Sequence, residues 1–134
     1  MEMHMRKKAA LLAFFVSVVL SVNAFAAAAT AKFITGDDLQ AMMKDGKQLA
    51  IIDVRDHLYY RKGHIPGSIN VSSDEAYNKR AIVFEYNPQD RVVIVGYGGT
   101  TGQEIIDMFL AYGFQNVYGL EGGMREWKGP VVEK

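Results

Sequence analysis

Three short apolar runs constrain the fold of this chain most strongly. They span residues 49–52, 91–95 and 116–118. Strands that are buried on both faces have continuous apolar runs of this kind, as in a parallel sheet. Between the second and third runs, residues 103–112 carry apolar side chains at helical spacing. The order strand, helix, strand therefore predicts an α/β fold with a mostly parallel sheet.

A further helix is predicted near the start of the folded part. Residues 32–34 form a short strand candidate, and Thr35 then has the properties of a helix N-cap. Asp37 and Asp38 fall in the first turn, where the helix dipole favours negative charge. Gly46 is expected to end this helix, because glycine readily adopts the conformation that follows a helix.

The first 26 residues have the three-part pattern of a secretory signal peptide. Three basic residues precede an apolar run, 9–20, and the small-residue site 24–26 follows. An uncleaved anchor is the alternative, since the alanines up to residue 29 extend the run. The strictly apolar stretch is shorter than the roughly 20 residues that a membrane span needs, so we expect cleavage.

Cleavage after residue 26 leaves a flexible tail, 27–31, and one domain, 32–134. This predicts a periplasmic or secreted protein with no membrane span after cleavage. The whole chain has 15 basic and 15 acidic residues, and removal of the leader leaves 12 and 14. Such a mildly acidic chain has no field that attracts nucleic acid, so nucleic acid is not an expected partner.

The chain contains no cysteine. This excludes disulfides, thiolate metal ligands and a thiol nucleophile. His57 and His64 are the only histidines after the leader, and no ligand spacing surrounds them. We therefore expect neither a metal site nor a cofactor.

Ligands of parallel sheets bind beyond the carboxyl ends of the strands, and two loops there have unusual sequences. The first begins with Asp53, Val54 and Arg55. The second is rich in glycine and threonine and contains Gly96, Tyr97, Gly98, Gly99, Thr100 and Thr101. We expect the functional site at these two loops.

The second loop also has part of a dinucleotide-binding pattern. Gly96 and Gly98 follow a strand, and Glu121 lies further along. The final glycine of that pattern, however, falls on Thr101, and a full dinucleotide domain needs a longer chain. A phosphate-binding Gly-Lys-Ser/Thr motif is missing too. We therefore do not expect a nucleotide cofactor.

Three motifs together resemble the rhodanese family. They are D-V-R at 53–55, G-H-I-P-G-S-I-N at 63–70 and L-E-G-G-M-R-E-W at 120–127. The resemblance implies a rhodanese-like three-layer sandwich with about five strands. Its register places Gly96 where active members have the cysteine that takes up and hands on a sulfur atom. The resemblance thus implies a sulfurtransferase fold without its nucleophile.

The polar residues of these motifs are expected to have structural roles. Asp53 and Arg55 are expected to pair or to brace the neighbouring loop, since no second carboxylate or histidine is placed for acid–base chemistry. His64 is expected to contact a backbone carbonyl and fix its own loop. Trp127 is expected to fill the core. A hydroxyl replacing the thiol, from Tyr97, Thr100 or Thr101, lacks a base to activate it.

Two functions stay open. The first is a noncatalytic rhodanese-like module, a pseudoenzyme that binds a protein partner or a small anion. The alternative is a thiosulfate-type sulfurtransferase whose cysteine is replaced by Gly96 in this chain, by mutation or engineering. The basic residues common in this loop are missing as well, which favours natural loss. The glycine-rich loop remains a possible but weak anion cradle.

A binding module needs a surface to bind with. Tyr59, Tyr60, Arg61 and Lys62 form an aromatic and basic cluster before Gly63, and such residues are common interface anchors. The resemblance implies that Tyr60 points inward. We predict that Tyr97 and either Tyr59 or Arg61 rim a shallow pocket whose floor is the Gly96 loop.

Overall fold

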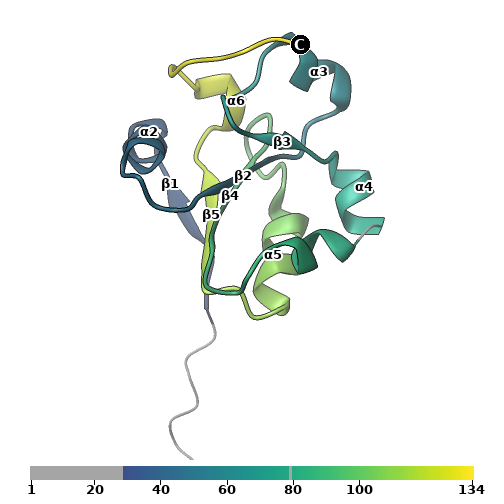
Figure 1. The fold of residues 1–134 in the computed structure, drawn as a ribbon. Helices are drawn as coiled ribbons and strands as arrows, with labels where there is room; N and C mark the ends of the chain where they lie inside the picture. The colour runs from purple at the N-terminus through teal and green to yellow at the C-terminus, as the bar shows by residue number, and fades with distance from the viewer. Residues whose placement is uncertain (1–28, 79) are drawn as a thin grey trace, which may run out of the picture.

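The computed structural model of the protein describes residues 29–78 and 80–134 (Figure 1). The expected signal peptide, residues 1–26, lies outside the described residues, as do the first two residues of the expected tail. Within the described ranges, no helix is long and apolar enough to cross a membrane.

A five-stranded sheet runs through the molecule in the order β1-β5-β4-β2-β3. Its strands are β1 Lys32–Ile34, β2 Ala50–Asp53, β3 Ile69–Asn70, β4 Arg91–Val95 and β5 Asn116–Leu120. Every neighbouring pair is parallel. The predicted parallel α/β sheet is therefore confirmed, and each of the three apolar runs of the sequence contributes a strand to it.

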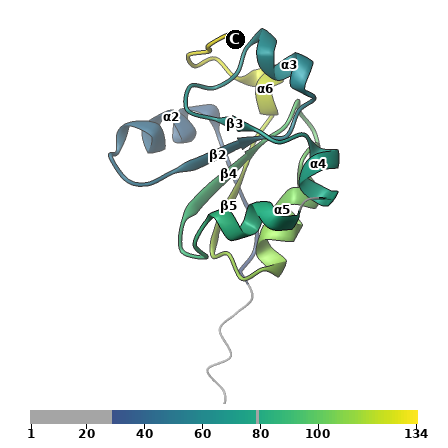
Figure 2. The same cartoon turned by 45° about the vertical axis from the view of Figure 1, so that its right-hand side comes forward.

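Helices cover both faces of the sheet and its carboxyl end. They are α2 Gly36–Lys44, α3 His57–Lys62, α4 Ser73–Asn78, the 3-10 helix η1 Arg80–Glu85, α5 Gln103–Ala111 and α6 Gly123–Glu126. Figure 2 shows α2 on one side of the sheet and α4 and α5 on the other, with α3 and α6 beyond the strand ends. This is the expected three-layer sandwich.

The two layers have separate apolar cores because side chains alternate along each strand. Ile52 packs in the cluster that contains Phe109 of α5. Its neighbour Ile51 packs in the cluster that contains Leu39 of α2. Burial on both faces explains why these strands read as continuous apolar runs.

The start of α2 agrees with the sequence prediction. The Thr35 hydroxyl accepts a hydrogen bond from the Asp38 backbone N–H at 3.1 Å, and the Asp38 carboxylate accepts one from the Thr35 backbone N–H at 2.9 Å. This reciprocal capping box satisfies two amides that a helix N-terminus otherwise leaves unpaired. The helix follows directly from β1 and packs its buried Leu39 against one face of the sheet.

Trp127 fills less of the core than expected. It is only partly buried and packs at the edge of the Leu39 cluster. Its indole N–H donates to the carbonyl of Pro130 at 3.0 Å. The side chain therefore also fixes the start of the C-terminal segment, which crosses the top of the molecule (Figure 1).

Candidate functional site

Three segments far apart in the sequence meet at the carboxyl end of the sheet. They follow β2 at Asp53, β4 at Val95 and β5 at Leu120. The Val54 N–H donates to the Val95 carbonyl at 2.9 Å, which joins the first two segments directly. The D-V-R motif, the glycine-rich loop and the L-E-G-G motif therefore form one site.

Asp53 and Arg55 form a buried ion pair at the base of this site. Arg55 Nη2 lies 2.8 Å from Asp53 Oδ2, and Nε donates to Asp53 Oδ1 at 3.0 Å. The same Nη2 donates to the Gly63 carbonyl at 2.8 Å. The pair thus has the bracing contacts expected from the sequence, and its charges are already satisfied by each other.

Asn70 completes this brace and was not singled out from the sequence. Its side-chain amide donates to the carbonyls of Asp53 and Arg55, both at 2.9 Å. His57 Nδ1 lies 3.1 Å from the remaining amide oxygen. The signal was present, because Asn70 is the last residue of the G-H-I-P-G-S-I-N motif.

His64 has a structural position. It is 2 % exposed, and its Nδ1 lies 2.8 Å from the Tyr60 carbonyl oxygen. Its ring stacks on that of Tyr60 with centroids 3.7 Å apart, and the Tyr60 hydroxyl donates to the Ser68 carbonyl at 2.6 Å. The loop after α3 is therefore fixed by its own side chains, with Tyr60 pointing inward.

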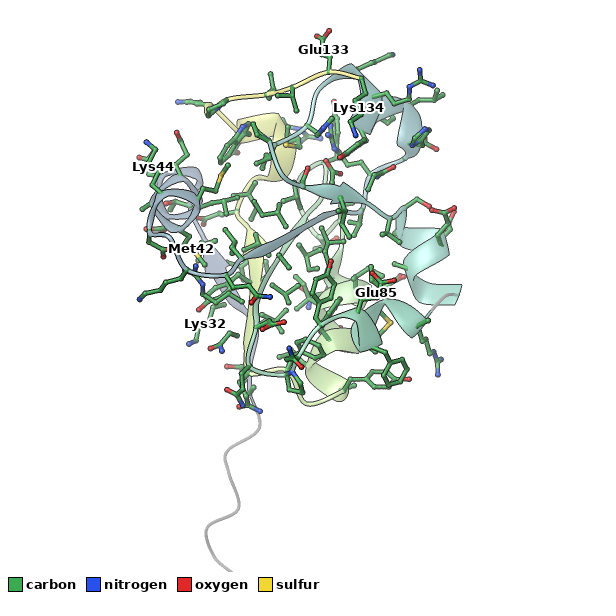
Figure 3. The ribbon with its side chains drawn as sticks, in the orientation of Figure 1. Lys32, Met42, Lys44, Glu85, Glu133 and Lys134 are labelled. Carbon is green, nitrogen blue, oxygen red and sulfur yellow. The ribbon has the colours of Figure 1, made fainter. Side chains whose placement is uncertain are left out.

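The C-terminal segment adds a second restraint on this loop. The backbones of His64 and Val132 exchange hydrogen bonds of 3.0 and 2.9 Å. The Lys134 N–H donates to the Arg61 carbonyl at 3.3 Å. Figure 3 shows Glu133 and Lys134 at the same end of the molecule as α3. The end of the chain therefore fixes α3 beside the site.

Gly96 is buried, and its loop curls tightly over it. A Cβ placed on Gly96 would lie 2.4 Å from the Thr101 carbonyl oxygen and 2.8 Å from Thr101 Cβ. The turn is fixed by the Thr101 hydroxyl, which donates to the Gly98 carbonyl at 2.8 Å. Even the smallest side chain at Gly96 therefore requires the backbone of the loop to move.

The start of α6 packs against the other side of this loop. Met124 and Arg125 donate their backbone N–H groups to the carbonyls of Gly96 and Tyr97, at 2.9 and 3.0 Å. Gly123 has a positive φ of 56°, and a Cβ there would lie 2.6 Å from the Gly96 oxygen. Only glycine permits this approach, which explains the L-E-G-G motif in physical terms.

The hydroxyls of the loop form no hydrogen bond to a base among the described residues. Among the described residues, no carboxylate or histidine makes a hydrogen bond with the hydroxyl of Tyr97, Thr100 or Thr101, and that of Thr101 donates to a carbonyl. A hydroxyl nucleophile needs an adjacent general base, so this arrangement does not activate one. Within the same part of the chain, no group of three potential ligands is placed to hold a metal ion.

A hollow of about 380 Å³ opens above the site. We call it the tyrosine hollow; its lining residues are Val54, Arg55, Asp56, Tyr59, Ser73, Tyr97 and Thr101. Tyr97 and Tyr59 line it as predicted, whereas Arg61 does not. The Gly96 loop contributes Tyr97 and Thr101 to the lining, while Gly96 itself is buried and does not line the hollow.

A pair of rings with a cation at each end runs past the hollow. The rings of Tyr59 and Tyr97 lie 5.7 Å apart. The Arg125 guanidinium lies 5.2 Å from the Tyr97 ring centroid, and Lys62 Nζ lies 5.9 Å from that of Tyr59. We call these four residues the tyrosine–cation row. Arg125 was missed from the sequence, because only the packing of α6 brings it to a loop that has no basic residue itself.

Comparisons with known proteins agree with this geometry. The family model described as the rhodanese-like domain matches residues 35–130. The chain is 32% identical over 90 residues to the thiosulfate sulfurtransferase GlpE of Pseudoalteromonas translucida, covering 67% of this chain and 83% of that protein. It is 29% identical over 113 residues to the tRNA uridine(34) hydroxylase of Hamiltonella defensa, covering 82% of this chain and 32% of that one.

Solved structures show the same fold. A rhodanese-like domain protein from Staphylococcus aureus superposes with a TM-score of 0.67 at 26% identity, covering 77% of this chain and 98% of that chain. The thiosulfate sulfurtransferase from Pseudomonas aeruginosa gives a TM-score of 0.62 at 25% identity, covering 77% and 20% of the two chains.

Proposed function

The chain belongs to the rhodanese-like domain family, and on that premise we propose that it is a noncatalytic member that binds a protein partner or a small anion. The binding face is the tyrosine hollow with the tyrosine–cation row. We place the protein in the periplasm or outside the cell, because residues 1–26 have the pattern of a signal peptide.

One observation carries the proposal. The position that corresponds to the nucleophile has no thiol, and the backbone of its own loop leaves no room for a side chain there. Sulfur transfer needs a thiolate that takes up a sulfur atom and hands it on. The sequence has no cysteine anywhere, and Gly96 occupies the corresponding position. The Thr101 carbonyl fills the space that a side chain at Gly96 would need.

The face above this position supports binding. Tyr59 and Tyr97 are about half exposed although both rings are large and apolar. Exposed aromatic side chains beside cations are the residue types that anchor protein interfaces. The volume of the hollow is in the range found for small-molecule sites. A hollow of this volume also accommodates one side chain of a protein partner.

The alternative is a thiosulfate sulfurtransferase that has lost only its cysteine. The relatives of that name support it through the fold they share with this chain. A chain that had lost only a side chain would retain room for it at Gly96. The 2.4 Å approach of Thr101 to the Cβ position instead supports a loop that has adapted to glycine.

A thiosulfate:cyanide sulfurtransferase assay tests the proposal. The purified protein is compared with its Gly96→Cys variant, and GlpE of Pseudoalteromonas translucida is the positive control. We expect no thiocyanate above background from either protein. The parent lacks a thiol, and in the Gly96→Cys variant the loop leaves no room for the cysteine side chain. Activity of the variant alone would support the alternative, and activity of the parent would overturn the proposal.

The location needs a separate test. The protein is expressed with a C-terminal tag in a Gram-negative host, and its fractions and intact mass are measured. We expect a periplasmic protein whose leader has been removed. A full-length protein in the cytoplasmic fraction would contradict this part of the proposal.

A further inference from the structure

We infer that the occupant of this face is an acidic protein segment, which sets an apolar side chain into the tyrosine hollow and places carboxylates on Lys62 and Arg125. This inference rests on the proposed function, that the face binds rather than reacts. It goes further by choosing a protein partner over a small anion and by stating the chemistry of that partner.

The two cations of the row have rings as their only described partners. Arg125 contacts Tyr97 and Lys62 contacts Tyr59, and neither makes an ion pair among the described residues. A guanidinium that lies on an aromatic ring keeps its donors available at the edge. The row therefore presents two unneutralised positive charges at the ends of an aromatic pair.

The nearby carboxylates do not neutralise these cations. Asp56 accepts a hydrogen bond from the Leu58 N–H at 2.8 Å and so caps α3. The Glu126 carboxylate lies against Gly122, at the start of its own helix. Asp53 is paired with Arg55. Asp37 and Glu126 line a neighbouring hollow with Arg125 but form no ion pair with it among the described residues. Lys62 and Arg125 are exposed, so a carboxylate from a partner can pair with each of them.

The position of the cations decides between a small anion and a longer segment. Neither Lys62 nor Arg125 lines the hollow. The one guanidinium that does line it, Arg55, is neutralised by Asp53, while the Asp56 carboxylate repels an anion inside. A small anion in the hollow thus meets no free cation. Only a ligand that extends over both tyrosine rings reaches the hollow and the cations together.

The apolar part of the surface fits one anchoring side chain. Val54 and the two tyrosine rings provide an apolar lining. Burial of an apolar side chain between aromatic rings is a strong contribution to binding. The flanking charges then set the register of the segment and speed its encounter with the surface.

The test is a titration of the isotope-labelled protein followed by nuclear magnetic resonance. The probes are the capped peptide Glu-Glu-Leu-Glu-Glu, its counterpart Lys-Lys-Leu-Lys-Lys, the anchor-free Glu-Glu-Gly-Glu-Glu, and thiosulfate. We expect the first peptide to shift the amides of Tyr59, Tyr97 and Arg125, with binding that weakens as salt is added. The lysine and glycine peptides should bind at least about tenfold more weakly, which corresponds to roughly 1.4 kcal/mol.

Variants assign the binding to the row. Arg125→Ala and Tyr97→Ala should each weaken the acidic peptide about tenfold or more, and Arg125→Glu should weaken it further. Tyr112→Ala is the matched control, because Tyr112 is an exposed ring at the far end of α5. It should leave binding unchanged. Dispersed spectra of every variant establish that each one is folded.

The outcomes separate this inference from the proposed function. Equal binding of the acidic and basic peptides, shifts confined to another face, or no shifts at millimolar peptide would overturn the acidic-segment inference. If thiosulfate shifts the amides of the site and no peptide binds, the acidic-segment inference is overturned as well. The proposal that the domain is a binding module would remain. Sulfur transfer by the parent chain would remove the proposed function itself.

Discussion

The guanidinium of Arg55 lies 2.8 Å from the carboxylate of Asp53, two residues earlier in the chain, and both side chains are buried. The same guanidinium reaches the Gly63 carbonyl. One pair therefore connects the end of β2 to the loop after α3. It holds the base of the tyrosine hollow without offering a free charge to a ligand.

Removal of Arg55 should destabilise the protein strongly. Arg55→Ala leaves the Asp53 carboxylate buried without its partner, and we expect a loss of about 3–5 kcal/mol in the free energy of unfolding. Urea denaturation measures it. Arg91→Ala is the matched control, since Arg91 pairs with the more exposed Asp45. Equal losses in the two variants would contradict the assigned role of the buried pair.

The two adjacent tyrosines should respond differently to loss of their hydroxyls. Tyr60→Phe removes the buried donor to the Ser68 carbonyl and should cost about 1 kcal/mol of stability. Tyr59→Phe removes an exposed hydroxyl and should have almost no effect on stability. Thermal denaturation of both variants checks this. A larger loss for Tyr59→Phe would show that the inward and outward assignments are reversed.

A side chain at Gly96 should strain the loop. Gly96→Ala adds one methyl group within 2.4 Å of the Thr101 oxygen, and we expect a loss of about 1–3 kcal/mol. Gly36→Ala is the control, because a Cβ there meets the Trp127 ring at an ordinary 3.5 Å. Alanine also favours the helix that begins at Gly36, so this control should be neutral or slightly stabilising. A neutral Gly96→Ala would show that the loop has room for a side chain.

The Asp45–Arg91 pair predicts a pH dependence. Hydrogen bonds from the Arg91 side chain, and next from the Lys47 backbone, hold the pKa of Asp45 below its ordinary value. A lowered folded-state pKa stabilises the protein above the unfolded pKa, near about pH 4, and this contribution is lost as pH falls through the folded pKa. Arg91→Gln should therefore raise the Asp45 pKa, and its stability deficit should shrink in acid.

Carboxyl-carbon resonances of Asp45, followed through an acid titration, measure that change. Denaturation at neutral and acidic pH measures the accompanying change in stability. Two results would contradict the assigned role of the Asp45–Arg91 pair. They are an unchanged Asp45 pKa in Arg91→Gln, and a loss of stability in that variant that grows as the pH is lowered.

Much of the fold could be predicted because its strands are marked by local sequence. The runs at β2, β4 and β5 are apolar without interruption, and α2 has a capping box at Thr35. The elements between residues 69 and 85 gave no such signal. There, β3 has only two residues, and α4 and η1 are short helices without an extended apolar repeat.

The site could be predicted only where its contacts are local. Asp53 and Arg55 are two residues apart, and His64 contacts a carbonyl four residues earlier. The hydrogen bonds from α6 to the carbonyls of Gly96 and Tyr97, and the place of Arg125 on Tyr97, depend instead on how α6 packs after β5. Such long-range packing has no periodic signature in a single sequence, so Tyr59 and Tyr97 could be named from the sequence and Arg125 could not.

The central claim is that this rhodanese-like face holds no sulfur covalently. Its most direct test is the intact mass of the purified protein after incubation with thiosulfate, measured before and after treatment with a thiol reductant. We predict an unchanged mass under both conditions. A gain of one sulfur atom that the reductant removes would show a covalent sulfur carrier in a chain without cysteine, and would contradict the account.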